Sequence, residues 1–345
     1  EQAAPAAAQN SAGRGGIPVK QLVLALLVVQ NACQMLSMRY SRVALSASAV
    51  NYLPSTAVVA SEALKVAVCM LLLLYKYRGG VPKLLWEEVV VNWRDTLKVA
   101  VPALVYMVQN NLLYVATSNL DAATCQITYQ LKILTTAMFA VGMLGKTIRP
   151  LKWLSLMILV AGIALVQLPQ MTTKAVVTIG NPAIGFTAVV SACVLSGFAG
   201  IWFEKILKGS DTSIWIRNVQ LGVIGGLLGL LGAFWKDGAA IQAAGFFQGY
   251  TPLVWSVVAQ VGCGGLLVAL VVRYADNILK GFATSLSIIA SGFLSMYFIP
   301  SLKFTPTPIW FAGTTLVLLA TVMYSLPDKQ QPAAMLPTPP KEDKS

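Results

Sequence analysis

The sequence contains no histidine and few charged residues. Without histidine, the commonest general base and the commonest metal ligand of proteins are missing. Charged residues make up 11% of the 345 residues and hydrophobic ones 57%, whereas soluble domains carry roughly 25% charged residues. The five cysteines lie in apolar stretches without a CxxC pair, which indicates small buried side chains instead of disulfides or a metal site. These absences exclude a soluble globular protein, and we expect neither a metal nor a cofactor.

Long apolar stretches account for most of the chain. A membrane-spanning helix needs about 20 predominantly apolar residues, and ten stretches meet this requirement. They cover residues 18–38, 53–75, 96–116, 121–144, 151–169, 181–203, 214–235, 252–272, 279–299 and 307–326. The sequence therefore predicts an all-α polytopic membrane protein. Its ten-helix domain covers 18–326, between a flexible tail at 1–17 and a disordered tail at 327–345.

The distribution of lysine and arginine predicts the orientation in the membrane. Eighteen of the 25 basic residues lie in the tails or the even-numbered connections, five lie in the odd-numbered connections, and two lie within spans. Cytosolic segments of membrane proteins are enriched in these residues, so both tails are expected in the cytosol. The net charge of +12 has the same origin. No single basic patch suggests a nucleic-acid partner.

Ten helices divide into two halves of five, over about 18–169 and 181–326. Because five is odd, the second half would run inverted relative to the first, as in transporters whose binding site lies at the centre of an inverted repeat. The fourth helix would then correspond to the ninth, and each contains a lysine, Lys132 and Lys280. We expect a 5+5 inverted repeat with these lysines in corresponding helices.

Lys132 lies close to the middle of its predicted span. A lysine at that depth costs at least ~2.5 kcal/mol, so it should face the bundle interior or a wet cavity. Gln126, Tyr129 and Gln130 lie within about two turns of it, and Gln126 and Tyr129 share much of its helix face. One interpretation pairs Lys132 with a carboxylate on a neighbouring helix. The other, which we favour, is an anion-binding site in a transport path.

Further polar residues lie within other spans. The third contains Tyr106, Gln109, Asn110 and Asn111. Carboxamides can join helices to one another, but their paired donors and acceptors also suit a nucleobase edge or a sugar hydroxyl. Asn218 is a comparable candidate in the seventh span. Nearby Glu204, Lys205 and Arg217 are expected either in a solvated interfacial cluster or at the mouth of the site.

The ninth and second spans contain the remaining candidates. Lys280 is followed by Thr284 and Ser285, whose hydroxyls could donate to phosphate oxygens; alternatively, Lys280 reaches the cytosolic interface. Glu62 and Lys65 are three residues apart on one helix face. We expect them to neutralise one another, with a role in gating or coupling left open.

Several long stretches resemble the nucleotide-sugar transporters of the drug/metabolite transporter superfamily. The resemblance is strongest to the branch that carries UDP-galactose, UDP-N-acetylglucosamine and CMP-sialic acid. It covers nearly all of the membrane domain. The matching stretches include STAVVASEALK (55–65), VQNNLLYVA (108–116), SNLDAATCQITYQLKILTTA (118–137), SGFAGIWFEKILK (196–208), WIRNVQLG (215–222), GFFQGY (245–250) and YADNILKGFATSLSI (274–288). Cys125 departs from the aromatic residue usual at its position.

The resemblance implies a Golgi transporter that exchanges cytosolic nucleotide sugar for lumenal nucleoside monophosphate. It implies that Lys132 and Lys280 bind phosphate, and that Tyr106, Asn110, Asn111 and Asn218 contact nucleobase, ribose or sugar. Gly222 is typical of the UDP-sugar carriers, where CMP-sialic acid carriers tend to have tyrosine. We therefore expect UDP-galactose exchanged for UMP, with UDP-N-acetylglucosamine/UMP or CMP-sialic acid/CMP exchange as alternatives. A homodimer or complexes with glycosyltransferases remain open.

Two rival functions are disfavoured by the residues themselves. A membrane-embedded transferase that uses nucleotide sugars would need carboxylates to hold a metal or act as a base, and the sequence has no DxD or DDxxD cluster. We therefore predict that the protein is not an enzyme. An exporter of hydrophobic drugs would not need the paired cations Lys132 and Lys280.

Overall fold

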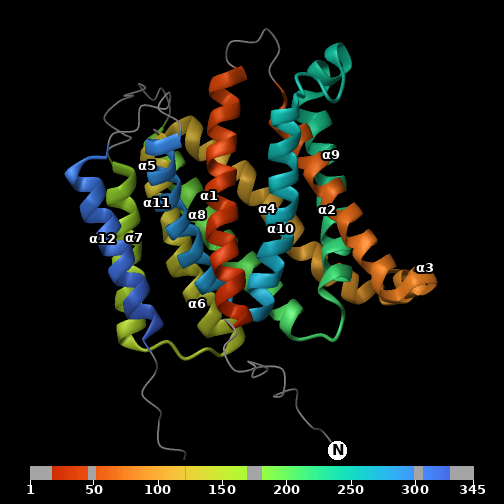
Figure 1. Cartoon of the computed structure of the whole chain (residues 1–345), viewed down its shortest axis with the longest axis horizontal. Coiled ribbons are helices and arrows are strands. Elements are labelled where there is room, and N and C mark those ends of the chain that lie inside the picture. The colour runs from red at the N-terminus through yellow and green to blue at the C-terminus, as the bar shows by residue number, and fades with distance from the viewer. Residues whose placement is uncertain (1–17, 46–51, 121, 169–180, 299–305, 327–345) are drawn as a thin grey trace, which may run out of the picture.

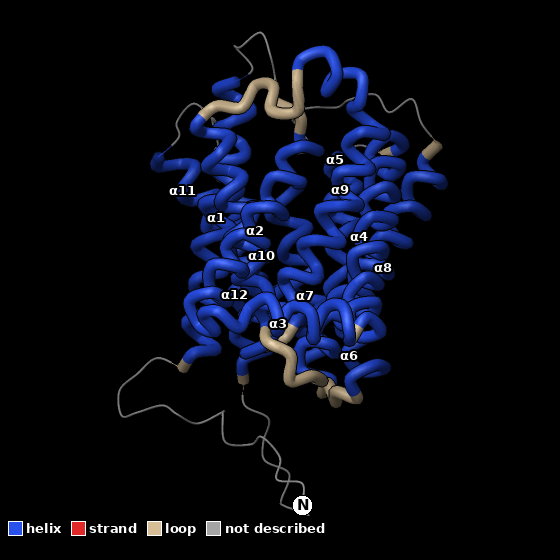
Figure 2. The backbone as a smooth tube through the Cα atoms, turned by 90° about the vertical axis from the view of Figure 1, so that its right-hand side faces the viewer, coloured by secondary structure: helices blue, strands red, loops and turns tan. Residues whose placement is uncertain are grey.

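The computed structural model describes residues 18–45, 52–120, 122–168, 181–298 and 306–326. Helices form nearly all of this part of the chain, which contains no strand (Figure 2). Ten of its helices are long and apolar enough to cross a membrane. The structure therefore confirms the predicted all-α polytopic class. The predicted tails at 1–17 and 327–345 lie outside the described residues.

Most of the long helices run along one common direction, although some are strongly tilted (Figure 1). Several begin at a proline, whose fixed φ suits a first turn and whose missing N–H costs nothing there. Their bounds are α1 Val19–Leu45, α2 Pro54–Tyr77, α3 Val81–Leu85, α4 Trp93–Asn119, α5 Ala122–Thr128, α6 Lys132–Leu144, α7 Pro150–Gln167, α8 Pro182–Lys208, α9 Ile214–Ala244, α10 Pro252–Tyr274, α11 Asn277–Phe298 and α12 Pro308–Ser325.

Two differences from the predicted helices matter for the arrangement. The stretch predicted as one helix over 121–144 is divided by a 3₁₀ turn, η4, at Tyr129–Leu131. Between α2 and α4, the short helices η2 (Arg78–Gly80), α3 and η3 (Trp86–Val91) were not predicted. They are too short to cross a membrane, so a search for long apolar stretches could not find them.

The start of α1 and the end of α12 lie at the same face of the bundle, the lower one in Figure 1. We call it the terminal face. The connections from α6 to α7 and from α8 to α9 also lie there, as an even number of crossings requires. The terminal face therefore contains the connections in which basic residues are concentrated.

The two halves are interleaved. Helix α1 packs against α10 and α11 of the second half, while α8 packs against α4 and α6 of the first. Helix α2 pairs with α9, and α7 pairs with α12. Exchanging every span of the first half with the corresponding span of the second half turns this set of pairings into itself. The contacts agree with a 5+5 repeat, which stays a prediction. A central space lined by both halves follows from this interleaving.

Candidate functional site

A cavity of about 580 Å³ lies inside the bundle. Lys132 and Lys280 both line it, from corresponding spans of the two halves. Five further predicted or neighbouring polar residues also line it: Gln126, Tyr129, Gln130, Thr284 and Ser285. Its volume falls in the range of about 300–1,000 Å³ that is usual for small-molecule sites. The structure thus brings together the two lysines and most of their predicted neighbours.

The ammonium of Lys132 lies over an aromatic ring. Its Nζ is 4.2 Å from the centroid of the Tyr129 ring, a geometry that stabilises a cation. Gln109 Nε2 donates to the Tyr129 hydroxyl at 2.8 Å, and that hydroxyl donates to Ser196 Oγ at 3.5 Å. Among the residues that the structure describes, no carboxylate forms an ion pair with Lys132. The described residues therefore show no such pairing, and Lys132 lines the cavity.

The 3₁₀ turn at Tyr129–Leu131 directly precedes Lys132. A 3₁₀ segment within a longer helix often marks a functional position, because its hydrogen bonds differ from those of the flanking turns. The backbone of Lys132 is fixed by the Thr136 hydroxyl, which donates to the Lys132 carbonyl at 2.7 Å. Helix α8 packs close by, since a Cβ at Gly197 would lie 2.8 Å from the backbone nitrogen of Thr136. The 3₁₀ turn therefore ends directly before a lysine that lines the cavity.

Lys280 lies in the first turn of α11. Asp276 caps this helix by accepting from the Leu279 N–H at 2.7 Å. A helix N-terminus carries a partial positive charge, which adds to that of Lys280 at the same end of the cavity. No carboxylate of the described chain forms an ion pair with Lys280. Both lysines thus line the cavity without an ion pair to a carboxylate of the described residues.

The helix ends show how the cavity is placed. Three lining residues belong to helix ends opposite the terminal face. They are Gln126 near the start of α5, Gln167 at the end of α7 and Trp310 near the start of α12. Asn277 and Lys280 are at the start of α11, which begins at the terminal face. The cavity thus runs along the bundle axis, which suits a path across the membrane.

The comparisons with known proteins agree with this geometry. The model of the nucleotide-sugar transporter family matches residues 16–325. This chain belongs to the nucleotide-sugar transporter family. It is therefore a transporter and not an enzyme.

Two kinds of transporter are found among the curated relatives of this transporter. It is 51% identical to a UDP-galactose translocator of Bos taurus and 52% identical to that of Homo sapiens, over 90% of this chain and 78% of each relative. It is 49% identical to a UDP-N-acetylglucosamine transporter of Mus musculus, over 90% of this chain and 96% of the relative. A solved crystal structure covering 89% of the transporter has a TM-score of 0.65 at 12% identity, which shows a shared fold.

The predicted pair Glu62–Lys65 is confirmed in the transporter, but outside the cavity. Lys65 Nζ lies 2.5 Å from Glu62 Oε2, and Lys65 is buried. Glycines of α9 and α10 make room for the pair: a Cβ at Gly222 would lie 3.4 Å from Lys65 Cε, and one at Gly265 would lie 3.2 Å from Lys65 Cδ. Gly222, which the family resemblance associates with the choice of substrate, therefore faces α2 in this structure.

Five other predicted residues also lie outside the lining of the cavity. One of them, Gln109, is buried on α4 and donates to the Tyr129 hydroxyl. Asn110 and Asn111 are exposed on α4, and the Asn111 amide donates to the Met107 carbonyl at 3.0 Å. Tyr106 is half-buried one turn before Gln109 on the same helix. Asn218 is buried and its amide donates to the Ile214 carbonyl at 2.9 Å. Contact of these side chains with a ligand stays a prediction.

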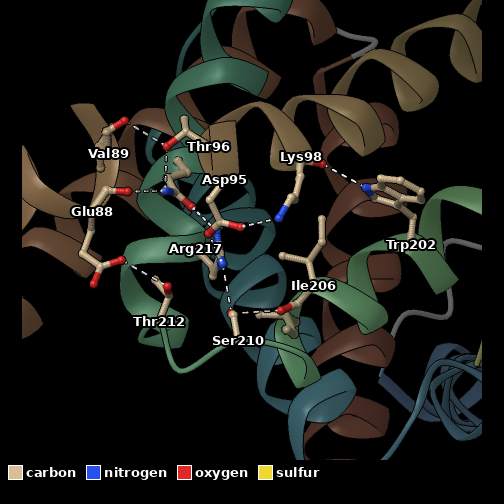
Figure 3. A network of polar contacts seen from close by, with 12 residues as sticks. Glu88, Val89, Asp95, Thr96, Lys98, Trp202, Ile206, Ser210, Thr212 and Arg217 are labelled. Carbon is tan, nitrogen blue, oxygen red and sulfur yellow. Dashed lines mark hydrogen bonds and ion pairs between the residues drawn. The ribbon is translucent and has the colours of Figure 1, made fainter. Parts of the chain in front are cut away.

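A solvated cluster of Glu204, Lys205 and Arg217 was one expectation, and it is wrong for two of these residues. Glu204 and Arg217 are both fully buried. Figure 3 shows Arg217 of α9 within a polar network. It forms an ion pair with Asp95 of α4 and donates to Gln220 Oε1 at 3.0 Å and Ser210 Oγ at 2.9 Å. The network joins the two halves at the terminal face.

The cysteines are only partly buried as expected. Cys69, Cys125 and Cys193 are buried, whereas Cys33 and Cys263 are exposed on their helices. Cys125, which departs from the family pattern, packs with Ala116, Leu120 and residues of α8, away from the cavity lining.

Proposed function

We propose that the protein exchanges a cytosolic nucleotide sugar for a lumenal nucleoside monophosphate across the Golgi membrane. The observation that supports this most is the cavity with Lys132 and Lys280, neither of which pairs with a carboxylate of the described chain. A diphosphate bridge has charges that these two ammonium groups can neutralise. Hydroxyls of Thr284 and Ser285, on the Lys280 helix, would complete the phosphate contacts.

UDP-galactose is the substrate we propose, with UMP as the counter-substrate. Relatives of 51–52% identity are named UDP-galactose translocators, and those of 48–49% identity are named UDP-N-acetylglucosamine transporters. The small difference favours galactose and keeps UDP-N-acetylglucosamine as the second candidate. Gly222 in place of tyrosine supports a UDP-sugar over CMP-sialic acid.

Exchange would follow from electrostatics. An empty cavity holds two like charges away from bulk water, where their repulsion is stronger than in solution. A bound nucleotide neutralises both and lowers the cost of an occluded intermediate, so the loaded carrier would change its open side faster than the empty one. The two halves would rock about the cavity, with both termini cytosolic. Tyr106, Asn110, Asn111 and Asn218 would reach the nucleoside in another state of this cycle.

Counterflow in proteoliposomes tests the proposal. Vesicles with purified protein and trapped radiolabelled UMP are exposed to UDP-galactose, UDP-N-acetylglucosamine, CMP-sialic acid, GDP-mannose or buffer alone. UDP-galactose should release most label, and buffer almost none. Equal release in every condition would indicate a leak and disprove exchange. Faster release by UDP-N-acetylglucosamine than by UDP-galactose would reverse the substrate assignment but keep the mechanism.

A further inference from the structure

A buried carboxylate at the terminal face connects three segments. Glu204 of α8 is fully buried, and its Oε1 lies 2.8 Å from both Lys146 Nζ and Lys208 Nζ. Its Oε2 accepts from the backbone N–H of Asn277 at 2.9 Å. A buried charge is costly unless it is paired and hydrogen-bonded. The cluster meets this requirement only while these segments stay together.

Glu204 also fixes the first turn of α11. One turn earlier on α8, a Cβ at Gly200 would lie only 2.1 Å from Asn277 Nδ2. The Asn277 side chain thus occupies a notch that glycine leaves open, while its N–H is held by Glu204. Asn277 and Lys280 share this turn, and both line the cavity. Helix α8 therefore determines where the Lys280 ammonium lies.

Some contacts of the Glu204 cluster lie within the second half, and others join it to the first half. Glu204, Lys208 and Asn277 all belong to the second half. Lys146, in the connection between α6 and α7, belongs to the first half and pairs with both Glu204 and, at 3.4 Å, Asp276. Separation of the halves at the terminal face would break the Lys146 contacts and leave the others intact. Lys208 would still neutralise Glu204.

We propose that Lys146 and Glu204 form the gate of the terminal face, and that Glu204 is a positioning residue for Lys280. This inference rests on the proposed function, because it assigns a gate to that transport cycle. When Lys146 leaves, Asn277 stays docked on α8, so Lys280 keeps its place as the cavity opens. The gate can thus open without dismantling the anion site.

Access of a thiol reagent to the cavity tests the gate. The reporter is Gly281→Cys, because Gly281 lines the cavity and a Cβ there meets no atom within 4 Å. The exposed Cys33 and Cys263 are changed to alanine in all variants. Sealed vesicles receive a membrane-impermeant maleimide outside, and protease removal of a C-terminal tag identifies vesicles whose terminal face points outward.

Lys146→Met should raise labelling of the reporter cysteine from the terminal face several-fold, compared with the reporter protein that keeps Lys146. Lys83→Met is the matched control, since it removes an exposed lysine outside the cluster, and it should leave labelling unchanged. Equal labelling in both variants would overturn the gate. If Lys146→Met does not accumulate, Lys146→Gln serves as the second variant. Counterflow of UMP is measured in parallel, so failure of transport is distinguished from failure of the gate.

The positioning role has its own test. Gly200→Ala pushes on Asn277 and should weaken binding of UMP to the purified protein about tenfold, as loss of a hydrogen bond to a charged group does. Gly142→Ala is the matched control, because its Cβ meets no atom within 4 Å. In contrast, Lys146→Met should change UMP affinity only by the shift in conformer population. Unchanged affinity in a folded Gly200→Ala protein would disprove positioning.

Discussion

Two lysines within the membrane-spanning helices have opposite surroundings. Lys65 of α2 is almost inaccessible, lies 2.5 Å from Glu62 Oε2 and is enclosed by glycines of neighbouring helices. Lys132 at the start of α6 lies over the Tyr129 ring and faces the cavity, without an ion pair among the described residues. The same residue type is thus neutralised in one region and left available in the other.

The difference separates a structural charge from a functional one. A charge within a membrane is tolerated when a partner neutralises it or when water and ligands reach it. Glu62 gives Lys65 the first solution. Only the second leaves an electrostatic attraction that a substrate can use. Changes to the two lysines should therefore affect different measurements, with binding altered at Lys132 and stability at Lys65.

The largest effect is expected at the cavity. Lys132→Met keeps the length of the side chain and removes its charge, so a bound phosphate would lose a desolvated partner. Such losses cost about 2–5 kcal/mol, which is roughly a 30-fold or greater loss of UMP affinity. Isothermal calorimetry with UMP measures it, and thermal unfolding checks that the protein is folded. Wild-type affinity would place Lys132 in the same structural class as Lys65.

Lys65→Met should show the reverse pattern. It leaves the Glu62 carboxylate without its partner in a mostly buried position, at a cost of about 1–3 kcal/mol in stability. The melting temperature should fall, while UMP affinity should stay within about twofold because the pair does not line the cavity. The double variant Glu62→Gln/Lys65→Met should recover most of the stability. If the free energy of UMP binding fell by more than the free energy of unfolding, the pair would have a role in coupling substrate binding to transport.

The sequence was sufficient to predict the ten spans and the two lysines of the cavity. Apolar length identifies a membrane helix, and an ammonium within one is rare enough to indicate a site. The structure brings Lys132 and Lys280 to one cavity, as their corresponding positions indicated. These features depend on composition along the chain, which a single sequence contains in full.

Features that depend on contacts between helices could not be predicted. Nothing in YQLK indicates the 3₁₀ turn at Tyr129–Leu131, and nothing along the chain indicates the close packing of α8 at Gly197. Gly222 was associated with substrate because of the family pattern, whereas its Cβ position points at Val66 and Lys65. Glu204 and Arg217 were given a solvated alternative because their neighbours along the chain are polar. Beside local partners, Glu204 pairs with Lys146 and Arg217 pairs with Asp95, both from distant segments.

Gly222→Ala tests the packing around Lys65, the lysine that is paired with a carboxylate. The new methyl group would lie 2.6 Å from Val66 Cγ2, so α2 and α9 must move or Val66 must turn. Overpacking of this kind costs about 1–3 kcal/mol. The melting temperature should fall and UMP affinity should change little. Gly232→Ala on the same helix, where a Cβ meets no atom within 4 Å, should have no such effect.

The smallest effect is expected from the residue that holds Tyr129 beneath Lys132. Gln109→Leu removes the donor to the Tyr129 hydroxyl, so the ring would keep only the long contact to Ser196 and would hold the ammonium less firmly. A neutral hydrogen bond is worth about 0.5–1.5 kcal/mol, which corresponds to a 2- to 12-fold loss of UMP affinity. Tyr129→Phe should cause a similar loss. Because Tyr129→Phe already removes the bond to Gln109, the double variant should bind UMP as tightly as Tyr129→Phe alone, and a further loss would show that Gln109 acts on the ligand independently of Tyr129.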